Sequence, residues 1–299
     1  MIQLTSQVIR HRRATVCLAF ASLVSLTPIA THGQVVRQDA GVGTAAAQAA
    51  RDLFRTDLGG GNIAGANGSF GGVRREINWD GAPAGFSAPN DLPGNFFNVN
   101  SPRGVVLSTP GTGFQVSGAT GDGGAGQPAA ANFGNINASY SAVFSPFSAQ
   151  RLFTPIASNI TDVTFFVAGT NTAGLTRGFG SIFSDVDVLG ASTIEFFDGT
   201  NSSLLKFIVP SFGGSVVPHF SFLGVSFDTP VVSRVRITTG NAPLSAATND
   251  QNGNPTDLVV MDDFVYGEVV QVVPEPATLS LFALGFVAVV VGARRRSGR

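Results

Sequence analysis

Short runs rich in Phe, Val, Ile and Thr recur along this 299-residue chain, and turn-forming Gly, Asn and Pro separate them. Residues of the first kind favour strands, and no amphipathic helical pattern lies between successive runs. A parallel sheet with helical crossovers is therefore excluded, and the pattern predicts an antiparallel β-sandwich. The predicted strands are 73–79, 104–109, 113–117, 135–144, 160–169, 178–186, 192–198, 204–210, 219–228, 233–240 and 258–269.

One segment ahead of these strands has the composition of a helix. Residues 44–58 are rich in alanine, carry Leu53, Phe54 and Leu58 on one side, and end at a run of glycines. Alanine has the highest helix propensity, and glycine commonly ends a helix. We therefore expect a mainly β domain over residues 34–271 that begins with one short helix.

The N-terminus has the three parts of a secretory signal peptide. A basic stretch at 10–13 precedes an apolar stretch at 14–29, and small residues follow before Gln34. The single cysteine, Cys17, lies inside this segment. We expect a signal peptidase to remove residues 1–33, so that the mature chain is exported and has no disulfide.

A second apolar stretch lies near the C-terminus. Its 17 residues, 277–293, carry no charge, and three arginines, Arg294, Arg295 and Arg296, follow them directly. As a helix the stretch is about 25 Å long, close to the roughly 30 Å of a bilayer's hydrocarbon core. Positive residues favour the cytoplasmic end of a spanning helix. The stretch therefore predicts a transmembrane helix with the rest of the chain outside.

A triplet of Pro274, Glu275 and Pro276 stands just before that stretch. The prolines exclude helix on its upstream side and leave an extended, accessible segment at the membrane surface. An ordinary C-terminal anchor explains the apolar stretch and the arginines but not the triplet. The order of triplet, apolar span and arginine cluster over 272–299 resembles the bacterial PEP-CTERM sorting signal. The resemblance implies processing by an exosortase, a membrane transpeptidase, and delivery to the cell envelope or an extracellular polymer.

The net charge of the exported part and its lack of cysteine exclude several classes of function. Seven of the 18 Lys and Arg residues lie in the two end segments, so the chain between them, up to Pro276, has a net charge of about −8. This charge disfavours nucleic acid as a partner. Without cysteine, thiol chemistry is excluded, and a Ser-His-Asp triad would have to use His219, which lies in a predicted strand. We expect a protein that is not an enzyme.

Acidic side chains on two predicted strands indicate a cation site or buried ion pairs. Asp185 and Asp187 share one face of their strand, and of the neighbours Asp262 and Asp263 one must point inward. A buried carboxylate needs a cation or several hydrogen bonds. Calcium bound by these four aspartates is one prediction. Ion pairs with the arginines of predicted strand 233–240 are the alternative.

Sugar-binding sites commonly combine an aromatic ring face with polar side chains. Trp79, flanked by Asn78 and Asp80, is the predicted sugar-binding group, and Tyr140 is a second aromatic candidate. The alternative for Trp79 is a place in the hydrophobic core.

An enzymatic alternative needs a pair of carboxylates, as in a glycan hydrolase or lyase. The candidates are Glu76, Asp80, Glu195 and Asp198, although nothing in their spacing selects a pair.

Four stretches, 74–118, 178–199, 222–241 and 258–268, together resemble an uncharacterised family of exported bacterial domains, over most of the chain from residue 51 to 268. Domains of this look have jelly-roll, galactose-binding-like sandwiches, which often bind sugars and carry a structural calcium. The resemblance implies no particular activity. We therefore predict an exported module that binds a glycan or matrix polymer, with a purely structural matrix protein or a carboxylate-dependent glycan hydrolase or lyase as alternatives.

Overall fold

The computed structural model describes residues 32–119, 131–213, 218–250 and 255–271. The predicted signal peptide up to residue 31 and the segment 272–299, with its predicted transmembrane helix, lie outside these ranges. Among the helices that are described, none is both long enough and apolar enough to cross a bilayer. The described chain is mainly β, and all pairings between its strands are antiparallel, which confirms the predicted class.

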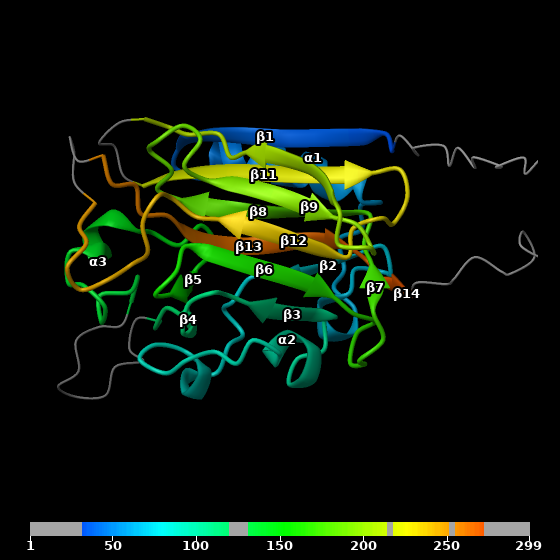
Figure 1. Cartoon of the computed structure of the whole chain (residues 1–299), viewed down its shortest axis with the longest axis horizontal. Coiled ribbons are helices and arrows are strands. Elements are labelled where there is room, and N and C mark those ends of the chain that lie inside the picture. The colour runs from blue at the N-terminus through cyan, green and yellow to red at the C-terminus, as the bar shows by residue number, and fades with distance from the viewer. Residues whose placement is uncertain (1–31, 120–130, 214–217, 251–254, 272–299) are drawn as a thin grey trace, which may run out of the picture. The chain divides into compact units, whose positions relative to one another are not determined.

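Two large sheets make up the domain (Figure 1). The first has seven strands in the order β1-β11-β8-β13-β5-β4, with β2 also beside β13. Its strands are β1 (Gln34–Val42), β2 (Arg74–Ile77), β4 (Gly113–Val116), β5 (Phe153–Ile156), β8 (Gly178–Ser184), β11 (His219–Phe227) and β13 (Val260–Gly267).

The second sheet has five strands in the order β10-β9-β12-β6-β3. Its strands are β3 (Val105–Ser108), β6 (Ile160–Phe165), β9 (Thr193–Phe197), β10 (Ser203–Ile208) and β12 (Arg234–Thr238). A separate short pair joins β7 (Gly174–Leu175) to β14 (Val270–Gln271).

The main hydrophobic core lies between the two sheets. Phe165 of β6 reaches the facing sheet, with ring centroids 6.3 Å from Phe179 and 5.5 Å from Tyr266. Along β12, Val235 and Ile237 are fully buried in this core while the intervening arginines face outward, as strand alternation requires. The predicted sandwich is therefore confirmed.

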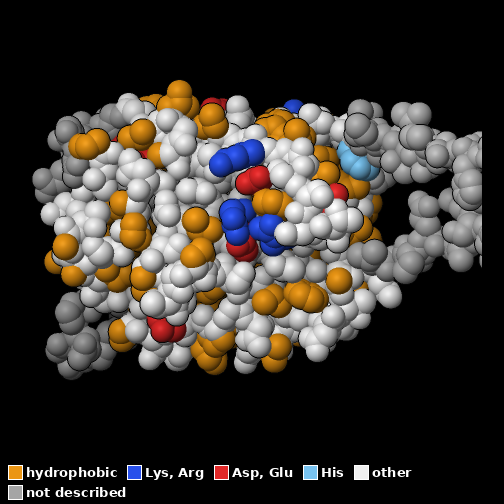
Figure 2. All heavy atoms as spheres, viewed as in Figure 1, with side chains coloured by type: hydrophobic (Ala, Val, Ile, Leu, Met, Phe, Trp, Pro, Cys, Tyr) orange, Lys and Arg blue, Asp and Glu red, His pale blue; other side chains and the backbone are white. Residues whose placement is uncertain are grey.

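The outward face of the five-stranded sheet carries alternating charges. Lys206, Glu195, Arg236 and Asp162 lie in register across four neighbouring strands. Figure 2 shows basic and acidic side chains together over the middle of this face. Directly opposed side chains of opposite charge stabilise a sheet modestly, so we interpret this row as a solvated, self-paired surface.

Helix α1 (Ala45–Asp57) covers the outer face of the seven-stranded sheet (Figure 1). Phe54 is buried against Phe222 of β11, with their ring centroids 5.7 Å apart. Gly180 and Gly224 are paired across β8 and β11 directly below this contact. A Cβ at Gly224 would stand 2.8 Å from atoms of both rings, so the helix can approach the sheet only where side chains are missing.

The helix lies within the predicted range 44–58 and ends just before Gly59, whose φ of 111° suits glycine. One detail differs, because Leu53 is exposed while Phe54 and Leu58 are buried. Leu53 therefore does not share the apolar side that the sequence predicted.

The predicted strand 135–144 is wrong. Residues Tyr140–Val143 form a short helix, α3, at one end of the sandwich. The Tyr140 ring is fully buried, and its hydroxyl lies 2.9 Å and 2.8 Å from the carbonyl oxygens of Ser245 and Thr248. Packing against this end cluster overrides the local strand propensity and also removes Tyr140 from the sugar-binding candidates.

Strands β1, β5, β7 and β14 were not among the predicted ones. The remaining short helices are α2 (Phe96–Val99) and two 3₁₀ turns, Ala66–Gly68 and Ala84–Phe86.

Candidate functional site

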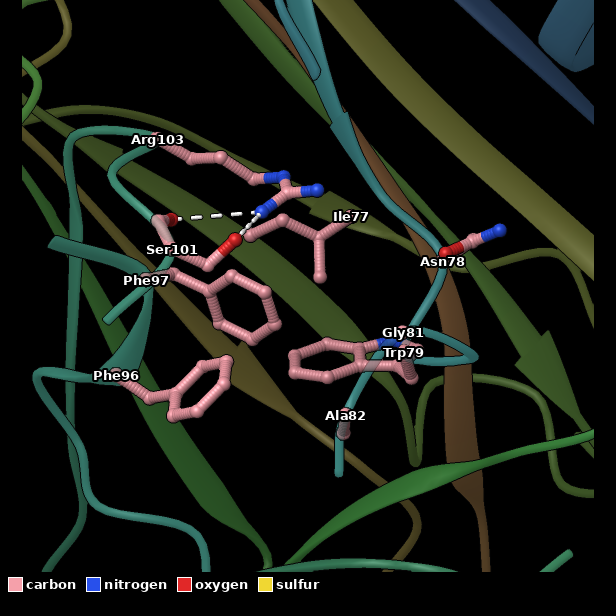
Figure 3. A pocket seen from close by; sticks show the side chains of 9 residues that line it. All are labelled: Ile77, Asn78, Trp79, Gly81, Ala82, Phe96, Phe97, Ser101 and Arg103. Atoms are coloured by element: carbon pink, nitrogen blue, oxygen red, sulfur yellow. Dashed lines mark hydrogen bonds between the residues drawn. The ribbon is translucent and has the colours of Figure 1, made fainter. Parts of the chain in front are cut away.

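Trp79 lies in the core between the sheets. Its ring stacks on Phe153 at a centroid distance of 4.0 Å, and Phe97 and Phe264 contact it edge-on. Only 1% of Trp79 is exposed, and the small cavity beside it has a volume of about 30 Å³ (Figure 3). Neither ring face is open to a sugar, so the structure selects the core position and corrects the predicted stacking role.

The two neighbours of Trp79 do not converge on a common site. Asn78 is exposed, whereas the Asp80 carboxylate accepts the backbone N–H groups of Gln150 at 2.6 Å and Arg151 at 3.1 Å. Burial raises the pKa of Asp80, although these hydrogen bonds oppose the rise. Asp80 therefore holds a loop in place rather than facing a ligand beside Trp79.

Asp262 and Asp263 sit at a β-bulge in β13. Met261 pairs with Phe183 and Phe264 pairs with Ser181, so both aspartates lie opposite the single residue Ile182. Simple alternation, which placed Met261 and Phe264 on opposite faces, is therefore wrong here, because both side chains enter the inter-sheet core.

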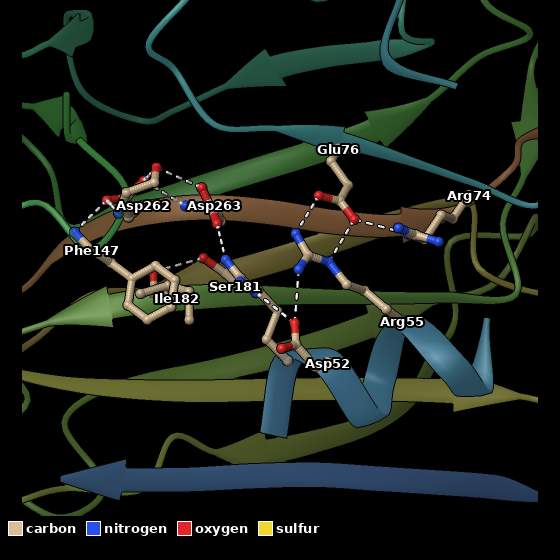
Figure 4. A network of polar contacts seen from close by, with 11 residues as sticks. Asp52, Arg55, Arg74, Glu76, Phe147, Ser181, Ile182, Asp262 and Asp263 are labelled. Carbon is tan, nitrogen blue, oxygen red and sulfur yellow. Dashed lines mark hydrogen bonds and ion pairs between the residues drawn. The ribbon is translucent and has the colours of Figure 1, made fainter. Parts of the chain in front are cut away.

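The bulge aims both carboxylates at the loop before β5 and at helix α1 (Figure 4). Asp262 accepts the backbone N–H groups of Phe147 at 2.7 Å and Ser148 at 3.1 Å. Asp263 pairs with Arg51 at 2.5 Å. Burial raises the pKa of Asp262, and the charge of Asp263 raises it further. Hydrogen bonds and an arginine thus already satisfy this pair, which the sequence offered as calcium ligands.

The arginine that pairs with the bulge is not one of those predicted. Arg234 and Arg236 of β12 instead bind Asp162 of β6, at 2.5 Å and 2.8 Å, on the other sheet. A buried Asp–Arg pair does link separate elements, as the sequence suggested. Its basic partner is Arg51 of α1.

Asp185 and Asp187 come together with His219 where β8 ends and β11 begins. His219 Nε2 lies 3.5 Å from Asp185 Oδ1 and 3.4 Å from Asp187 Oδ1. The pKa of Asp185 is raised to about 8, mainly by burial and also by the charges of Asp187, Asp250 and Asp257. Carboxylate and imidazole groups at these separations can hold a metal ion.

A larger cleft lies between α1 and β2, where the sequence suggested no site. Its volume is about 550 Å³. Helix α1, the glycine loop after it, Phe70 and strand β2 supply the lining, which comprises Asp52, Arg55, Thr56, Gly60, Gly61, Asn62, Phe70, Arg74 and Glu76.

Four charged side chains that line this cleft form a network of ion pairs (Figure 4). Arg55 binds Glu76 through two hydrogen bonds of 2.8 Å and 2.6 Å, and also reaches Asp52 at 2.8 Å. Arg74 binds Glu76 at 2.8 Å and the carbonyls of Gly60 and Gly61. Burial alone would raise the pKa of Glu76, but the two arginines outweigh it and hold the pKa below its usual value.

Phe70 gives the cleft an aromatic wall. The ring is half-buried, and the Arg74 guanidinium carbon lies 4.3 Å from its centroid. The sequence carried one usable signal for this site. Arg51 and Arg55, four residues apart in the predicted helix, had to share one face, but nothing local showed that this face meets Glu76 and Asp263.

The four carboxylates of the alternative glycan hydrolase or lyase are not brought together as a catalytic pair. Glu76 and Asp80 belong to or follow β2, and each has the partners given above. Glu195 lies on β9 of the other sheet and accepts a hydrogen bond from Ser203 at 2.7 Å. Asp198 closes the following turn by accepting the N–H groups of Thr200 and Ser202.

Comparison with known proteins gives one clear match. Residues 272–296 match the model of the PEP-CTERM protein-sorting motif, as the sequence suggested. The matched residues include Pro274, Glu275, Pro276 and the cluster Arg294 to Arg296. A motif of this kind marks an exported protein that an exosortase processes on its way to the cell envelope. This part of the chain lies outside the described residues.

The matched motif does not include the β-sandwich domain. No curated protein matches the chain. Among solved structures, the enzymatically active domain of tailspike protein 4 from bacteriophage CBA120 is similar at 12% identity. The alignment covers 60% of this chain and 20% of the tailspike chain, with a TM-score of 0.21, which supports no conclusion about fold or function.

Proposed function

We propose that this exosortase-sorted chain is a glycan-binding module of the cell envelope or extracellular polymer and has no catalytic activity. The proposed site is the cleft between α1 and β2, in place of the surface around Trp79. The observation that carries the proposal is a cleft of about 550 Å³ that combines a half-buried aromatic ring with planar polar side chains.

The chemistry of the cleft suits a neutral, hydroxyl-rich ligand. Asp52, Arg55, Arg74 and Glu76 supply two positive and two negative charges that neutralise one another. Guanidinium and carboxylate groups that are already fixed in place offer both donors and acceptors to sugar hydroxyls. The Arg74 guanidinium already packs over the Phe70 ring, and we propose that the rest of this half-buried ring contacts the C–H face of a sugar.

The same network supports a binding role over a hydrolytic one. A general acid near neutral pH needs a raised pKa, and the arginines lower the pKa of Glu76 instead. Asp52 is already ion-paired with Arg55, and about half of its side chain is exposed. Extracellular polysaccharide is therefore the proposed partner, and the exosortase and signal peptidase act only during export.

A glycan array probed with the purified chain tests this function. We expect selective binding to a subset of neutral polysaccharides or oligosaccharides. Binding only to positively charged glycans, which the net negative charge of the chain would explain, would contradict the proposal. Absence of binding to every glycan class would also contradict it and would leave a purely structural matrix role. Release of reducing ends from a bound glycan would contradict the absence of catalysis.

A further inference from the structure

A second site lies away from the proposed glycan cleft and is independent of it. We infer that Asp185, Asp187 and His219 bind a divalent first-row transition metal, with Zn²⁺ as the best-fitting ion. The fold brings them together because β8 and β11 are antiparallel neighbours with Ser184 opposite Phe220. Asp185, the residue after β8, therefore faces His219, the first residue of β11.

The separations between the ligand atoms fit a metal centre. His219 Nε2 lies 3.5 Å from Asp185 Oδ1 and 3.4 Å from Asp187 Oδ1, and all three ligand atoms lie within 4.8 Å of one another. Zinc bonds of about 2.1 Å at tetrahedral angles place neighbouring ligand atoms about 3.4 Å apart. The imidazole nitrogen is therefore already at ligand-to-ligand distance from both carboxylates.

Among the described residues, none donates a hydrogen bond to the Asp185 and Asp187 oxygens that face His219. Only 6% of the Asp185 side chain is exposed, and its carboxylate, which points at His219, accepts no hydrogen bond from the described residues. In the same part of the chain, Asp187 Oδ1 is fully buried and also accepts none. By contrast, Asp262 is bound by backbone N–H groups and Asp263 by Arg51. A cation supplies the partner that the first pair lacks.

The surrounding residues support the site and leave one side open. The fully buried Asp257 accepts the N–H groups of Asp187 at 3.1 Å and Val188 at 3.3 Å, which fixes the loop after β8. Such outer-shell contacts commonly orient metal ligands. The Asp187 side chain is 31% exposed, so an ion can enter from solvent and a water can complete the coordination.

The imidazole decides which metal the site prefers. Calcium takes six to eight oxygen ligands, whereas one nitrogen with carboxylate oxygens suits zinc and other first-row metals. The sequence pattern alone offered calcium as the ion for Asp185 and Asp187, with Asp–Arg pairs as the alternative. The structure adds His219 to them and thereby changes the expected ion.

Thermal unfolding with and without metal tests the inference. The full chain, purified without a histidine tag, is first stripped with a chelator and then melted with Zn²⁺, Ca²⁺ or no metal. We expect Zn²⁺ at a hundred times its dissociation constant to raise Tm by roughly 5–10 °C, and Ca²⁺ to have a much smaller effect. Co²⁺ should give visible absorption bands of a tetrahedral site.

Two variants and one control locate the effect. Asp185→Asn keeps a side chain that tolerates the φ of 72° at this position, so it should fold but lose the Zn²⁺-dependent rise in Tm. His219→Gln should lose both that rise and the Co²⁺ bands. Asp39→Asn, on the exposed strand β1, should behave as wild type. The inference would be overturned if only Ca²⁺ raised Tm or if neither metal did. An equal Zn²⁺-dependent rise in wild type and all three variants would also overturn it.

Discussion

At the scale of single residues, this chain stabilises buried aspartates in different ways. Asp162 pairs with two arginines, Asp263 pairs with one, and Asp262 is held by backbone N–H groups. Asp185 is the exception, because it is buried beside His219 and other acids and its carboxylate accepts no hydrogen bond from the residues that the structure describes. Its charge is therefore unfavourable in the folded state unless a cation is present.

The raised pKa of Asp185 predicts an unusual pH dependence for the metal-free chain. Its value of about 8 lies above the ordinary 3.8, so between these pH values the folded state binds the proton more tightly than the unfolded state. The free energy of unfolding should then fall as pH rises from about 4 to 8, by at most about 1.4 kcal/mol per pH unit for this group. Denaturant unfolding in chelator at several pH values measures the slope.

Asp185→Asn provides the control for this slope. The neutral amide cannot ionise, so the variant should lose less stability than wild type as pH rises. Asp257, whose pKa is raised to about 6 mainly by burial, and the nearby Asp187 and Asp250, whose pKa values burial also raises, leave a residual slope in the variant. Equal slopes in wild type and variant would contradict the prediction, because they would show that ionisation of Asp185 does not lower the free energy of unfolding.

At the scale of elements, the docking of α1 on the seven-stranded sheet positions the proposed cleft. The helix supplies Asp52 and Arg55, while β2 supplies Arg74 and Glu76. The contact depends on Gly224, which leaves space for Phe54. A side chain at this glycine would push the helix away from the sheet.

Gly224→Ala should therefore destabilise the domain by roughly 1–3 kcal/mol, because its methyl group would stand 2.8 Å from the Phe54 and Phe222 rings. Chemical denaturation measures the loss. Gly85→Ala is the matched control, since a Cβ there meets no atom within 4 Å, and its stability should change little. An unchanged stability for Gly224→Ala would contradict the tight docking of α1.

Alternation and turn residues predicted most strands and α1, because these signals are local. Three misses have physical causes. The bulge at Asp262 and Asp263 shifts the period of β13, so its inward face changes after Met261. Residues 135–144 have strand-like composition, but Tyr140 packs into an end cluster as part of a helix. The polar edge strand β1 lies outside the core and has no apolar alternation to reveal it.

Candidate sites were predictable only where their residues are close in sequence. Asp185 and Asp187 stood out as neighbours, but His219 joins them only through the pairing of β8 with β11. The cleft could not be predicted in this way, because its lining combines residues of α1 and β2, whose proximity no local sequence pattern encodes. Trp79 was a reasonable aromatic candidate, yet its surroundings of Phe97, Phe153 and Phe264 come from three separate elements or loops.

At the scale of the whole molecule, the chain combines a β-sandwich with a sorting motif. The motif occupies residues 272–296, after the last described strand, β14. The sorting motif and the proposed binding cleft therefore lie in separate parts of the sequence.

Replacing Pro274, Glu275 and Pro276 together by alanine should block processing by the exosortase. We expect the uncut chain to accumulate in the inner membrane while its domain stays folded, because the change lies beyond the sandwich. Mass spectrometry of the mature chain and cell fractionation give the readout. The same mature mass and location as wild type would contradict a sorting role for the triplet.

The most direct test of the central claim is a calorimetric titration of the purified chain with the glycan that binds best on the array. Phe70→Leu removes the aromatic ring and Asn62→Ala removes an exposed amide, both in the cleft. Each should weaken binding by about tenfold, or about 1.4 kcal/mol, while Lys206→Ala on the opposite sheet leaves the affinity unchanged. Full affinity in both cleft variants, with unfolding curves like those of wild type, would contradict glycan binding at this cleft.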